Sequence, residues 1–291
     1  MISNAEVAEA VDSDLLASGI DALLSGKPPE GALVMNRPIS PDRIHFTEIV
    51  NKVESHLGPP DLYAGGAGGV LVRWQHGPNT LTVTQEQRVT MSLRASASLD
   101  AAEAAAFRSG VGPSPGQASS YLELPYLWQV VRRGSALERP GVLRTSDWDQ
   151  LEQSLRCLLK LWVEQTSVLY EAGWCDEVAF DVSEEASGDR VLGVLQSAEE
   201  GLALFLYDDR KTTARPEPDE VVARGWQHRV PQFRAWFASF DPGADTAETA
   251  AGIIVRELRL RGSATPLSVS LTALSRNGES RLQLPGIPLR S

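Results

Sequence analysis

Histidine is the side chain that most often carries acid–base or metal chemistry, and this chain has four: His45, His56, His76 and His228. His45 and His56 fall on one expected helix, where their separation of about 16 Å along the axis is too large to share an ion. His76 borders an expected turn, and His228 closely follows Trp226. We therefore expect boundary or surface histidines, with no metal site and no catalytic histidine.

Carboxylates are the next candidates, because a pair of them can act as general acid and general base. Asp147 and Asp149 fall in the expected first turn of a helix, where negative charge meets the positive end of the helix dipole. Asp208 and Asp209 stand beside two basic residues at the end of an expected strand, a pattern typical of a solvated loop. Their spacing predicts capping and solvation, not a paired catalytic site.

The two cysteines, Cys157 and Cys175, complete the set of reactive side chains. Cys157 lies beside Leu158 on an expected helix and should pack as a small apolar residue. Neither cysteine has a sequence neighbour that would lower its pKa, so both are expected to be reduced, unreactive thiols. The chain also lacks the Gly-x-Ser-x-Gly and His-Glu-x-x-His motifs, and we expect it not to be an enzyme.

A glycine-rich segment at residues 65–69 has the composition of a phosphate-binding loop. It lacks the Gly-Lys-Ser/Thr ending of such loops and precedes an expected strand, whereas a dinucleotide loop follows a strand and opens a helix. We interpret it as a flexible turn and expect no cofactor.

Large aromatic residues form the one unusual local enrichment. They are Trp226, Phe233, Trp236, Phe237 and Phe240, and their spacing from 233 onward is that of a helix. Core packing is one interpretation. The other is an anchor surface for a partner, because tryptophan and phenylalanine are common in interface hot spots, and these five are our candidate partner-binding residues.

The net charge of -11 and a pI near 4.9 bound the possible partners. Such an acidic surface repels phosphate backbones, so nucleic-acid binding is not expected. No apolar run approaches the roughly 18 residues of a membrane span. The first residues have neither a basic start nor an apolar core, so we expect no secretory signal, no membrane association and a cytoplasmic location.

Turn and loop signals from glycine and proline divide the chain into three parts. Residues 1–38 are expected to form a helical arm and linker, residues 39–141 an N-terminal α+β domain, and residues 142–291 a C-terminal α+β domain. The arm carries apolar residues at helical spacing and is expected to dock on its own domain or on a partner.

The N-terminal domain is expected to hold an antiparallel meander between helices. A helix begins near Ser40-Pro41 and ends at Gly58, and period-two alternation predicts strands at 70–75, 80–84 and 89–94 with one wet face. A helix after Asp100 and a strand at 126–131 follow.

The C-terminal domain repeats this plan. A capping box of Ser146 and Asp149 opens a helix with an apolar stripe of Trp148, Leu151, Leu155, Leu158 and Trp162. Strands are predicted at 167–171, 177–182, 191–196, 202–207 and 267–271, and helices before Gly225, at 233–240 and from Asp245 to Gly262. The fold class is therefore α+β, with two domains that each contain an antiparallel meander covered by helices.

Segment 147–271 resembles the YbjN-like, type III secretion chaperone-like family of the actinobacterial type. The residues that carry the resemblance are Asp147-Trp148-Asp149, Val178-Ala179-Phe180, Arg224-Gly225-Trp226 and Glu257-Leu258-Arg259 before Gly262. The resemblance implies a non-enzymatic binder that uses its sheet and helices to hold a polypeptide segment or to pair with itself.

We accordingly predict a protein-binding or chaperone-like module whose partner is another protein or a second copy of the chain. Two alternatives remain open at this point. One is an immunity or inhibitor protein whose acidic surface masks a basic toxin. The other is an enzyme with a site assembled from residues far apart in the sequence.

Overall fold

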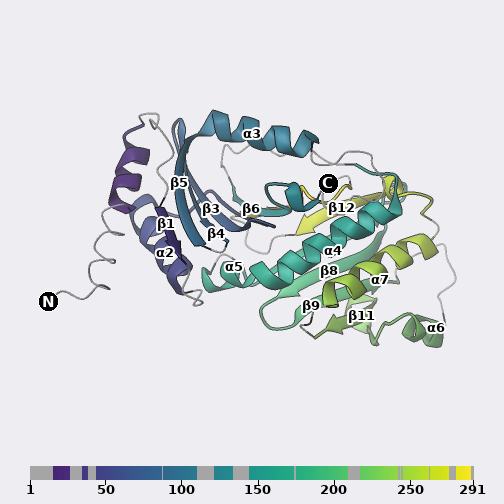
Figure 1. The fold of residues 1–291 in the computed structure, drawn as a ribbon. Helices are drawn as coiled ribbons and strands as arrows, with labels where there is room; N and C mark the ends of the chain where they lie inside the picture. Colours follow the sequence, from purple (N-terminus) through teal and green to yellow (C-terminus); the bar gives the residue numbers. More distant parts are fainter. Residues whose placement is uncertain are drawn as a thin grey trace.

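The structure is a computed structural model that describes residues 16–26, 35–38, 44–86, 88–109, 121–133, 144–173, 175–208, 217–241, 243, 245–261, 263–274 and 280–289. Two antiparallel sheets with covering helices make up these residues, so the predicted α+β class is confirmed (Figure 1). Residues 16–24 form a helix whose Leu16, Ile20 and Leu23 are buried in the main core, and the rest of the predicted N-terminal helices lies outside the described residues.

The first sheet has seven strands, each antiparallel to its neighbours. In spatial order they are β1 (Met35–Pro38), β5 (Arg88–Ala95), β4 (Asn79–Gln85), β3 (Gly69–His76), β2 (Leu62–Gly66), β6 (Trp128–Arg132) and β13 (Ser280–Gln283). The helices α2 (Ile44–Leu57) and α3 (Ser96–Ser109) accompany it, together with the short turn η1 (Tyr121–Glu123).

The prediction of one wet face on this sheet holds only in part, because Arg94 on that face is exposed while the centre of the face is covered. Arg73, Thr80 and Thr82 occupy the polar side of the alternation, yet all three are buried. The cause is α3, which lies across that side and brings Glu103 to a two-point ion pair with the Arg73 guanidinium (Figure 1). Alternation shows which residues share a face, but it does not show whether a helix arrives to cover them.

The second sheet has six strands and is also antiparallel throughout. Its order is β10 (His228–Val230), β11 (Ala235–Phe240), β9 (Gly201–Tyr207), β8 (Arg190–Ser197), β7 (Glu177–Glu184) and β12 (Val269–Leu274). Its helices are α4 (Trp148–Gln165), α5 (Ser167–Glu171), α6 (Pro218–Ala223) and α7 (Thr246–Leu260), with the turns η2 (Pro231–Phe233) and η3 (Pro266–Ser268). In Figure 1, α4 and α7 lie side by side over one face of this sheet.

Helix α4 starts as its sequence suggests, with one change at the cap. The Oδ1 of Asp147 accepts a hydrogen bond from the backbone N–H of Asp149 at 2.8 Å, so the N-cap is Asp147 and not the predicted Ser146. The predicted stripe is buried at Leu151, Leu155, Leu158 and Trp162, while Trp148 is only half-buried. An amphipathic helix with a cap at its start buries this stripe against the sheets.

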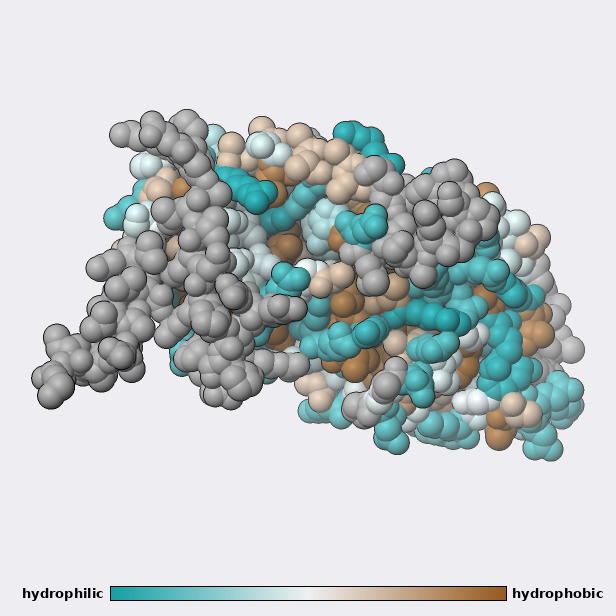
Figure 2. Space-filling view, in the orientation of Figure 1, coloured by the Kyte–Doolittle hydropathy of each residue, from teal (hydrophilic) through white to brown (hydrophobic). Residues whose placement is uncertain are grey.

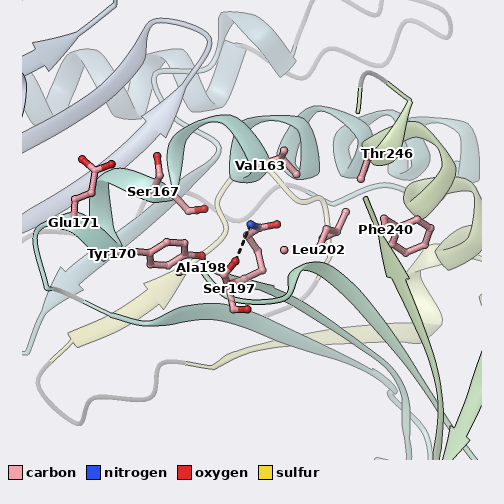
Figure 3. Close-up of a pocket in the computed structure, with 12 residues that line it drawn as sticks. Val163, Ser167, Tyr170, Glu171, Ser197, Ala198, Leu202, Phe240 and Thr246 are labelled. Atoms are coloured by element: carbon pink, nitrogen blue, oxygen red, sulfur yellow. Dashed lines mark hydrogen bonds between the residues drawn. The ribbon is translucent and has the colours of Figure 1, made fainter. Parts of the chain in front are cut away.

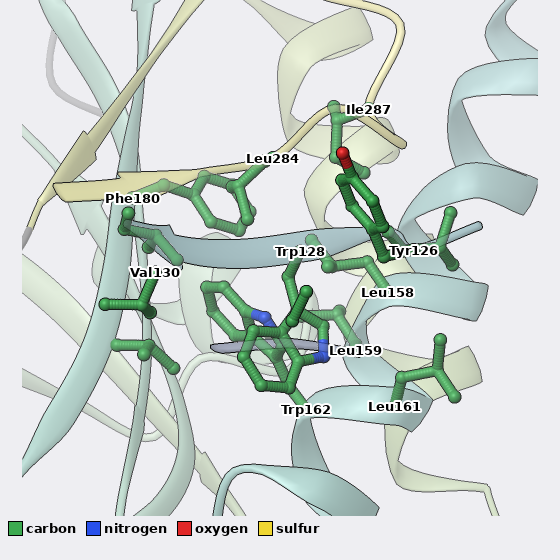
Figure 4. Packing of buried hydrophobic residues seen from close by; sticks show 14 of the residues in the cluster. Tyr126, Trp128, Val130, Leu158, Leu159, Leu161, Trp162, Phe180, Leu284 and Ile287 are labelled. Carbon is green, nitrogen blue, oxygen red and sulfur yellow. The ribbon is translucent and has the colours of Figure 1, made fainter. Parts of the chain in front are cut away.

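The C-terminal end of α4 connects the two sheets. The indole N–H of Trp128 donates to the Oε1 of Gln165 at 3.3 Å, and the Nε2 of Gln165 donates to the carbonyl of Gly66 at 2.8 Å. Trp162, one turn earlier, packs edge-on against Phe180 of β7 (Figure 4). Both sheets therefore share one hydrophobic core around this helix.

This contact explains the glycine-rich segment. A Cβ at Gly65 would stand 2.2 Å from the Gln165 Oε1 and 2.5 Å from the Trp128 ring, closer than any real packing allows. Residues 65 and 66 lie inside β2, so the predicted flexible turn is limited to 67–68. The glycine serves a close helix–sheet approach rather than a phosphate.

The last strand returns to the first sheet. β13 pairs with β6, and the side-chain amide of Gln129 donates to the Oε1 of Gln283 at 2.6 Å. Leu284 and Ile287 then insert into the core (Figure 4), where a Cβ on Gly286 would lie 2.2 Å from Leu127. The segment that the sequence assigned to the C-terminal unit thus completes the sheet of the N-terminal one.

Two predicted elements change type. Residues 167–171 form the helix α5 and not a strand, because Val168 and Leu169 continue the buried side of α4 after a single break at Thr166. Residues 235–240 form the strand β11 and not a helix. Aromatic residues at 233, 236, 237 and 240 match helical spacing, but pairing with β9 on one side and β10 on the other overrides that pattern.

Candidate functional site

The candidate chemical residues do not converge. Among the described residues, no group of three or more His, Cys, Asp or Glu side chains is arranged to hold a metal ion. The Nδ1 of His56 lies 2.8 Å from the Lys52 carbonyl on its own helix, His76 is exposed, and His228 contacts Phe237. The side chain of His45 lies outside what the structure describes.

Both cysteines are free thiols set in apolar surroundings. Burial raises the pKa of Cys157, and it raises the pKa of Cys175 to about 12, with the neighbouring Asp176 adding to the shift. A nucleophilic cysteine needs a lowered pKa, so the environment of these two thiols is that of structural residues.

The five predicted partner-binding residues separate into three locations. Trp226 is fully buried, and its indole N–H donates to the Oε1 of Glu257 on α7 at 3.1 Å. Arg224 also donates to this oxygen, at 2.8 Å, so the buried carboxylate has two partners. Trp226 is therefore a core residue that holds the segment after α6 against α7.

The strand β11 divides the other predicted residues between its two faces. Trp236 and Phe240 pair with Leu206 and Leu202 of β9 on the side covered by helices, where both are half-buried against the core. Phe237 alternates with them and points to the opposite side, which no described helix covers (Figure 1). The sequence cluster is thus one core residue, two covered-face residues and a remainder on the uncovered face.

We call this uncovered side of the second sheet the open face. Its centre is an aromatic group in which the Phe205 ring lies 5.3 Å from the Phe237 ring and 6.1 Å from the Phe233 ring. The ring of His228 stands 5.1 Å from Phe237 at the β10 edge. Phe233 is 60% exposed, the most of any phenylalanine among the described residues.

A hollow of about 380 Å³ lies on the open face between η2 and β9. Phe205, Tyr207 and Phe233 form its aromatic walls, and its rim consists of Arg190, Gln232 and Arg234. Arg234 has a φ of +49°, and it is the one residue other than glycine with a positive φ in the described part of the chain. This strained conformation follows η2 and allows the chain to turn from Phe233 into β11.

Sequence reasoning missed five of the six residues that line this hollow, all except Phe233. Phe205 and Tyr207 lie on a strand that was predicted correctly and Arg190 lies at the start of another, but their shared face with Phe237 depends on the strand order β11-β9-β8. The alternation of Phe205 and Tyr207 along β9 was the available signal.

Behind the hollow, an ion pair and an aromatic ring are packed together. The Tyr207 hydroxyl donates to the Oδ1 of Asp181 at 3.1 Å, while an Arg190 nitrogen lies 3.5 Å from the Oδ2. The Arg190 guanidinium also stacks over the Tyr207 ring at 4.4 Å. Burial and the Asp181 carboxylate raise the pKa of Tyr207 to about 12, and Gly193 leaves the room that Tyr207 and Asp181 occupy.

The charges of this cluster differ in their access to solvent. The Arg190 side chain is 55% exposed, whereas that of Asp181 is only 10% exposed. Arg229 on β10 makes a similar ion pair with the nearly buried Asp208 at 2.7 Å, but it lies across from Trp236 on the helix-covered side. On the open face, Arg190 therefore presents its guanidinium to solvent and keeps its carboxylate partner inside.

A second hollow of about 360 Å³ lies where α4, α5 and α7 meet the β8–β9 turn (Figure 3). Its hydroxyls already serve the fold: Tyr170 donates to the Gln196 carbonyl at 2.8 Å, and Thr246 to the Asp241 carbonyl at 2.6 Å. Glu171 points away from Leu202 and Phe240 in Figure 3. This hollow has no converging charged groups and is the weaker candidate.

The helix-covered side differs in character from the open face. Figure 2 shows this side, and hydrophilic residues run between hydrophobic ones over α4 and α7. None of the described helices has the length and apolar character that a membrane crossing requires.

Comparison with known proteins provides no relative: no family model matches, and no curated protein or solved structure matches with significance. The resemblance to the YbjN-like family therefore stays a prediction.

Proposed function

We propose that this protein is a non-enzymatic, protein-binding or chaperone-like module that holds a partner polypeptide on the open face of its second sheet. The observation that carries the proposal is the aromatic group of Phe205, Phe233 and Phe237, which lies on a sheet face that none of the described helices covers. A contiguous aromatic surface with a polar rim is a common feature of protein interfaces.

The geometry also suits polypeptide binding in its details. Phe205 and Phe237 are anchored in neighbouring strands and hold their positions, while Phe233 stands on the η2 turn and is mostly exposed. Rigid aromatic side chains lose little conformational entropy on binding, so they make effective anchors. The hollow beside them offers a place for one side chain of the partner.

The environment of the titratable groups supports a binding role over an enzymatic one. The resolved shifts raise the pKa of tyrosines and cysteines through burial, which keeps these groups protonated and unreactive near neutral pH. A catalytic site generally shows the reverse, because the pKa of its nucleophile or base is shifted toward the working pH.

Affinity capture with matched variants tests the proposal. Tagged full-length protein is expressed in its native cells, and the co-purifying proteins are identified by mass spectrometry for the wild type, Phe233→Ala and Leu260→Ala. Leu260, on α7, is 61% exposed, so it matches Phe233 in exposure but lies on the opposite side of the sheet.

We expect a partner to be retained by the wild type and Leu260→Ala and lost from Phe233→Ala. A hot-spot aromatic typically contributes about 2 kcal/mol or more to association, which lowers affinity by at least about thirtyfold. Equal retention by all three proteins would contradict binding at the open face.

A further inference from the structure

We infer that the open face selects a polypeptide segment in which apolar or aromatic side chains are flanked by carboxylates. This inference rests on the proposed function and adds the chemistry of the partner. It combines two observations, the aromatic hollow and the solvent-facing guanidinium groups around it.

The hollow defines the apolar part of the partner. Its walls are the rings of Phe205, Tyr207 and Phe233, and its volume of about 380 Å³ accommodates a large side chain. Aromatic rings pair favourably edge-on or offset with other rings, and they bury a large area for each residue. A phenylalanine, tryptophan or leucine of the partner is therefore the expected occupant.

The rim defines the charged part. Arg190 and Arg234 both line the hollow, and none of the described residues that line it is acidic. Besides stacking on the Tyr207 ring, Arg190 makes one long polar contact, of 3.5 Å, with the Asp181 Oδ2, and a guanidinium has five N–H donors. Because its side chain is more than half exposed, a carboxylate of the partner could pair with it while Asp181 stays in place.

The whole-molecule charge makes this local pattern informative. The chain carries a net charge of -11, so an arginine-rimmed surface is an exception on it. The carboxylate that pairs with Arg190, that of Asp181, is turned inward, and its side chain is only 10% exposed. A short segment with a few carboxylates meets the guanidinium groups first, since screening limits repulsion from the rest of the protein to about a Debye length of 8–10 Å.

Other occupants fit less well. A second copy docked by its own open face would place Arg190 and Arg234 opposite an equally arginine-rimmed surface. A nucleic acid would bring many phosphates toward an acidic protein, and Arg190 at this hollow already has an internal carboxylate. A short acidic and aromatic polypeptide avoids both problems.

Labelled synthetic peptides test the inference by fluorescence polarisation. The probe has a Phe-Ser-Phe core between two pairs of glutamates, and its matched versions carry glutamine for glutamate, or serine for phenylalanine. The protein variants are Arg234→Gly and Arg190→Gln, with Arg281→Gln as the control, because Arg281 is an exposed arginine on β13 of the first sheet. Arg234→Gly also suits the positive φ at that position, so it removes the charge and keeps an allowed backbone conformation.

We expect the glutamate probe to bind about tenfold more tightly than the glutamine version, and the serine version to lose binding. Arg234→Gly and Arg190→Gln should remove most of the preference for glutamate, so that each variant binds the glutamate and glutamine probes with nearly equal affinity, while Arg281→Gln should behave as wild type.

Four outcomes would overturn the inference. Equal binding of the glutamate and glutamine probes would show an apolar site without charge selection. Absence of binding by every peptide would rule out acidic, aromatic polypeptide segments as the partner. Tighter binding of single-stranded oligo(dT) would indicate a nucleic-acid surface. Concentration-dependent dimerisation abolished by Phe233→Ala would assign the face to a second copy. The capture experiment separately decides the proposed function, because it depends on Phe233 and not on the arginines.

Discussion

The two sheets are built on the same plan, an antiparallel meander with helices, but they differ in how their polar faces are covered. On the first sheet α3 covers the centre of that face, and the Arg73–Glu103 pair is enclosed with side chains 5% and 13% exposed. On the second sheet no described helix covers it, and Arg190 remains 55% exposed beside a buried Asp181. The same ion-pair chemistry thus serves as internal packing in one sheet and as a surface feature in the other.

The difference indicates which region is structural and which is available for binding. The first sheet has its apolar residues already buried by the fold, as Val72, Leu81 and Met91 illustrate. A sheet covered on one face keeps aromatic residues such as Phe233 and Phe237 available for another molecule. Four experiments test this difference between the two sheets.

Removing residues 280–291 should have the largest effect. The deletion takes away β13, the edge strand next to β6, together with the buried Leu284 and Ile287. Because both sheets share one core around α4, we expect them to lose cooperative folding together, measured by calorimetry and by hydrogen exchange in each sheet. If the second sheet keeps its original protection while the first unfolds, the two halves are independent units.

Trp226→Ala should cost about 3–5 kcal/mol of unfolding free energy, because it empties a fully buried site and removes one partner of Glu257. Trp236→Ala should also lower stability, by a smaller amount, since Trp236 lies on the covered face and is half-buried. Phe233→Ala, on the open face, should change stability by less than about 1 kcal/mol. Denaturant titration measures all three. A loss at Phe233 as large as that at Trp226 would make the aromatic group part of the core.

Breaking the two ion pairs should give unequal results. Arg73→Leu leaves Glu103 buried beside the Tyr126 hydroxyl and should cost about 3 kcal/mol, with the double change Arg73→Leu and Glu103→Leu recovering most of the loss. Arg190→Gln should cost under about 1 kcal/mol, because its guanidinium is already more than half in solvent. Equal costs in chemical denaturation would contradict the distinction between an enclosed and an open polar face.

Alkaline pH should give the smallest effect. Burial and Asp181 raise the pKa of Tyr207 from 10.0 to about 12, so the protonated phenol favours the folded state fully below pH 10. That contribution is lost as the pH rises from 10 through 12, and Tyr207→Phe should show a shallower decline in stability over this range. Burial, with Glu103 next, raises the pKa of Tyr126 still further, so Tyr126 should ionise after Tyr207 in a titration of phenolate absorbance. The reverse order would show that α3 does not protect the first sheet's polar face.

The sequence predicted the regular elements where the local pattern was strong. Period-two alternation located β3, β4, β5, β7, β8 and β9, and the apolar stripe with its acidic cap located α4. The prediction failed where neighbours overrode the local pattern, as in β11, whose aromatic spacing imitates a helix while strands pair with it on both sides.

The candidate site was predicted only in part, for a related reason. Phe233 and Phe237 were chosen for their residue type and lie on the open face, but Trp226, chosen with them, is a core residue. Phe205 and Arg190 were not chosen, because their relation to Phe237 exists only through strand order and register.

By itself the sequence determined the α+β class, the meanders and the amphipathic helices, because these depend on side-chain periodicity and on caps within a few residues of each other. Three features depend on tertiary packing. β13 returns to the first sheet, α3 encloses Arg73, and the open face of the second sheet, which no described helix covers, leaves Phe233 and Arg190 at the surface. The physical reason is that covering a sheet face requires a helix from elsewhere in the chain, and periodicity along a strand does not record where that helix packs.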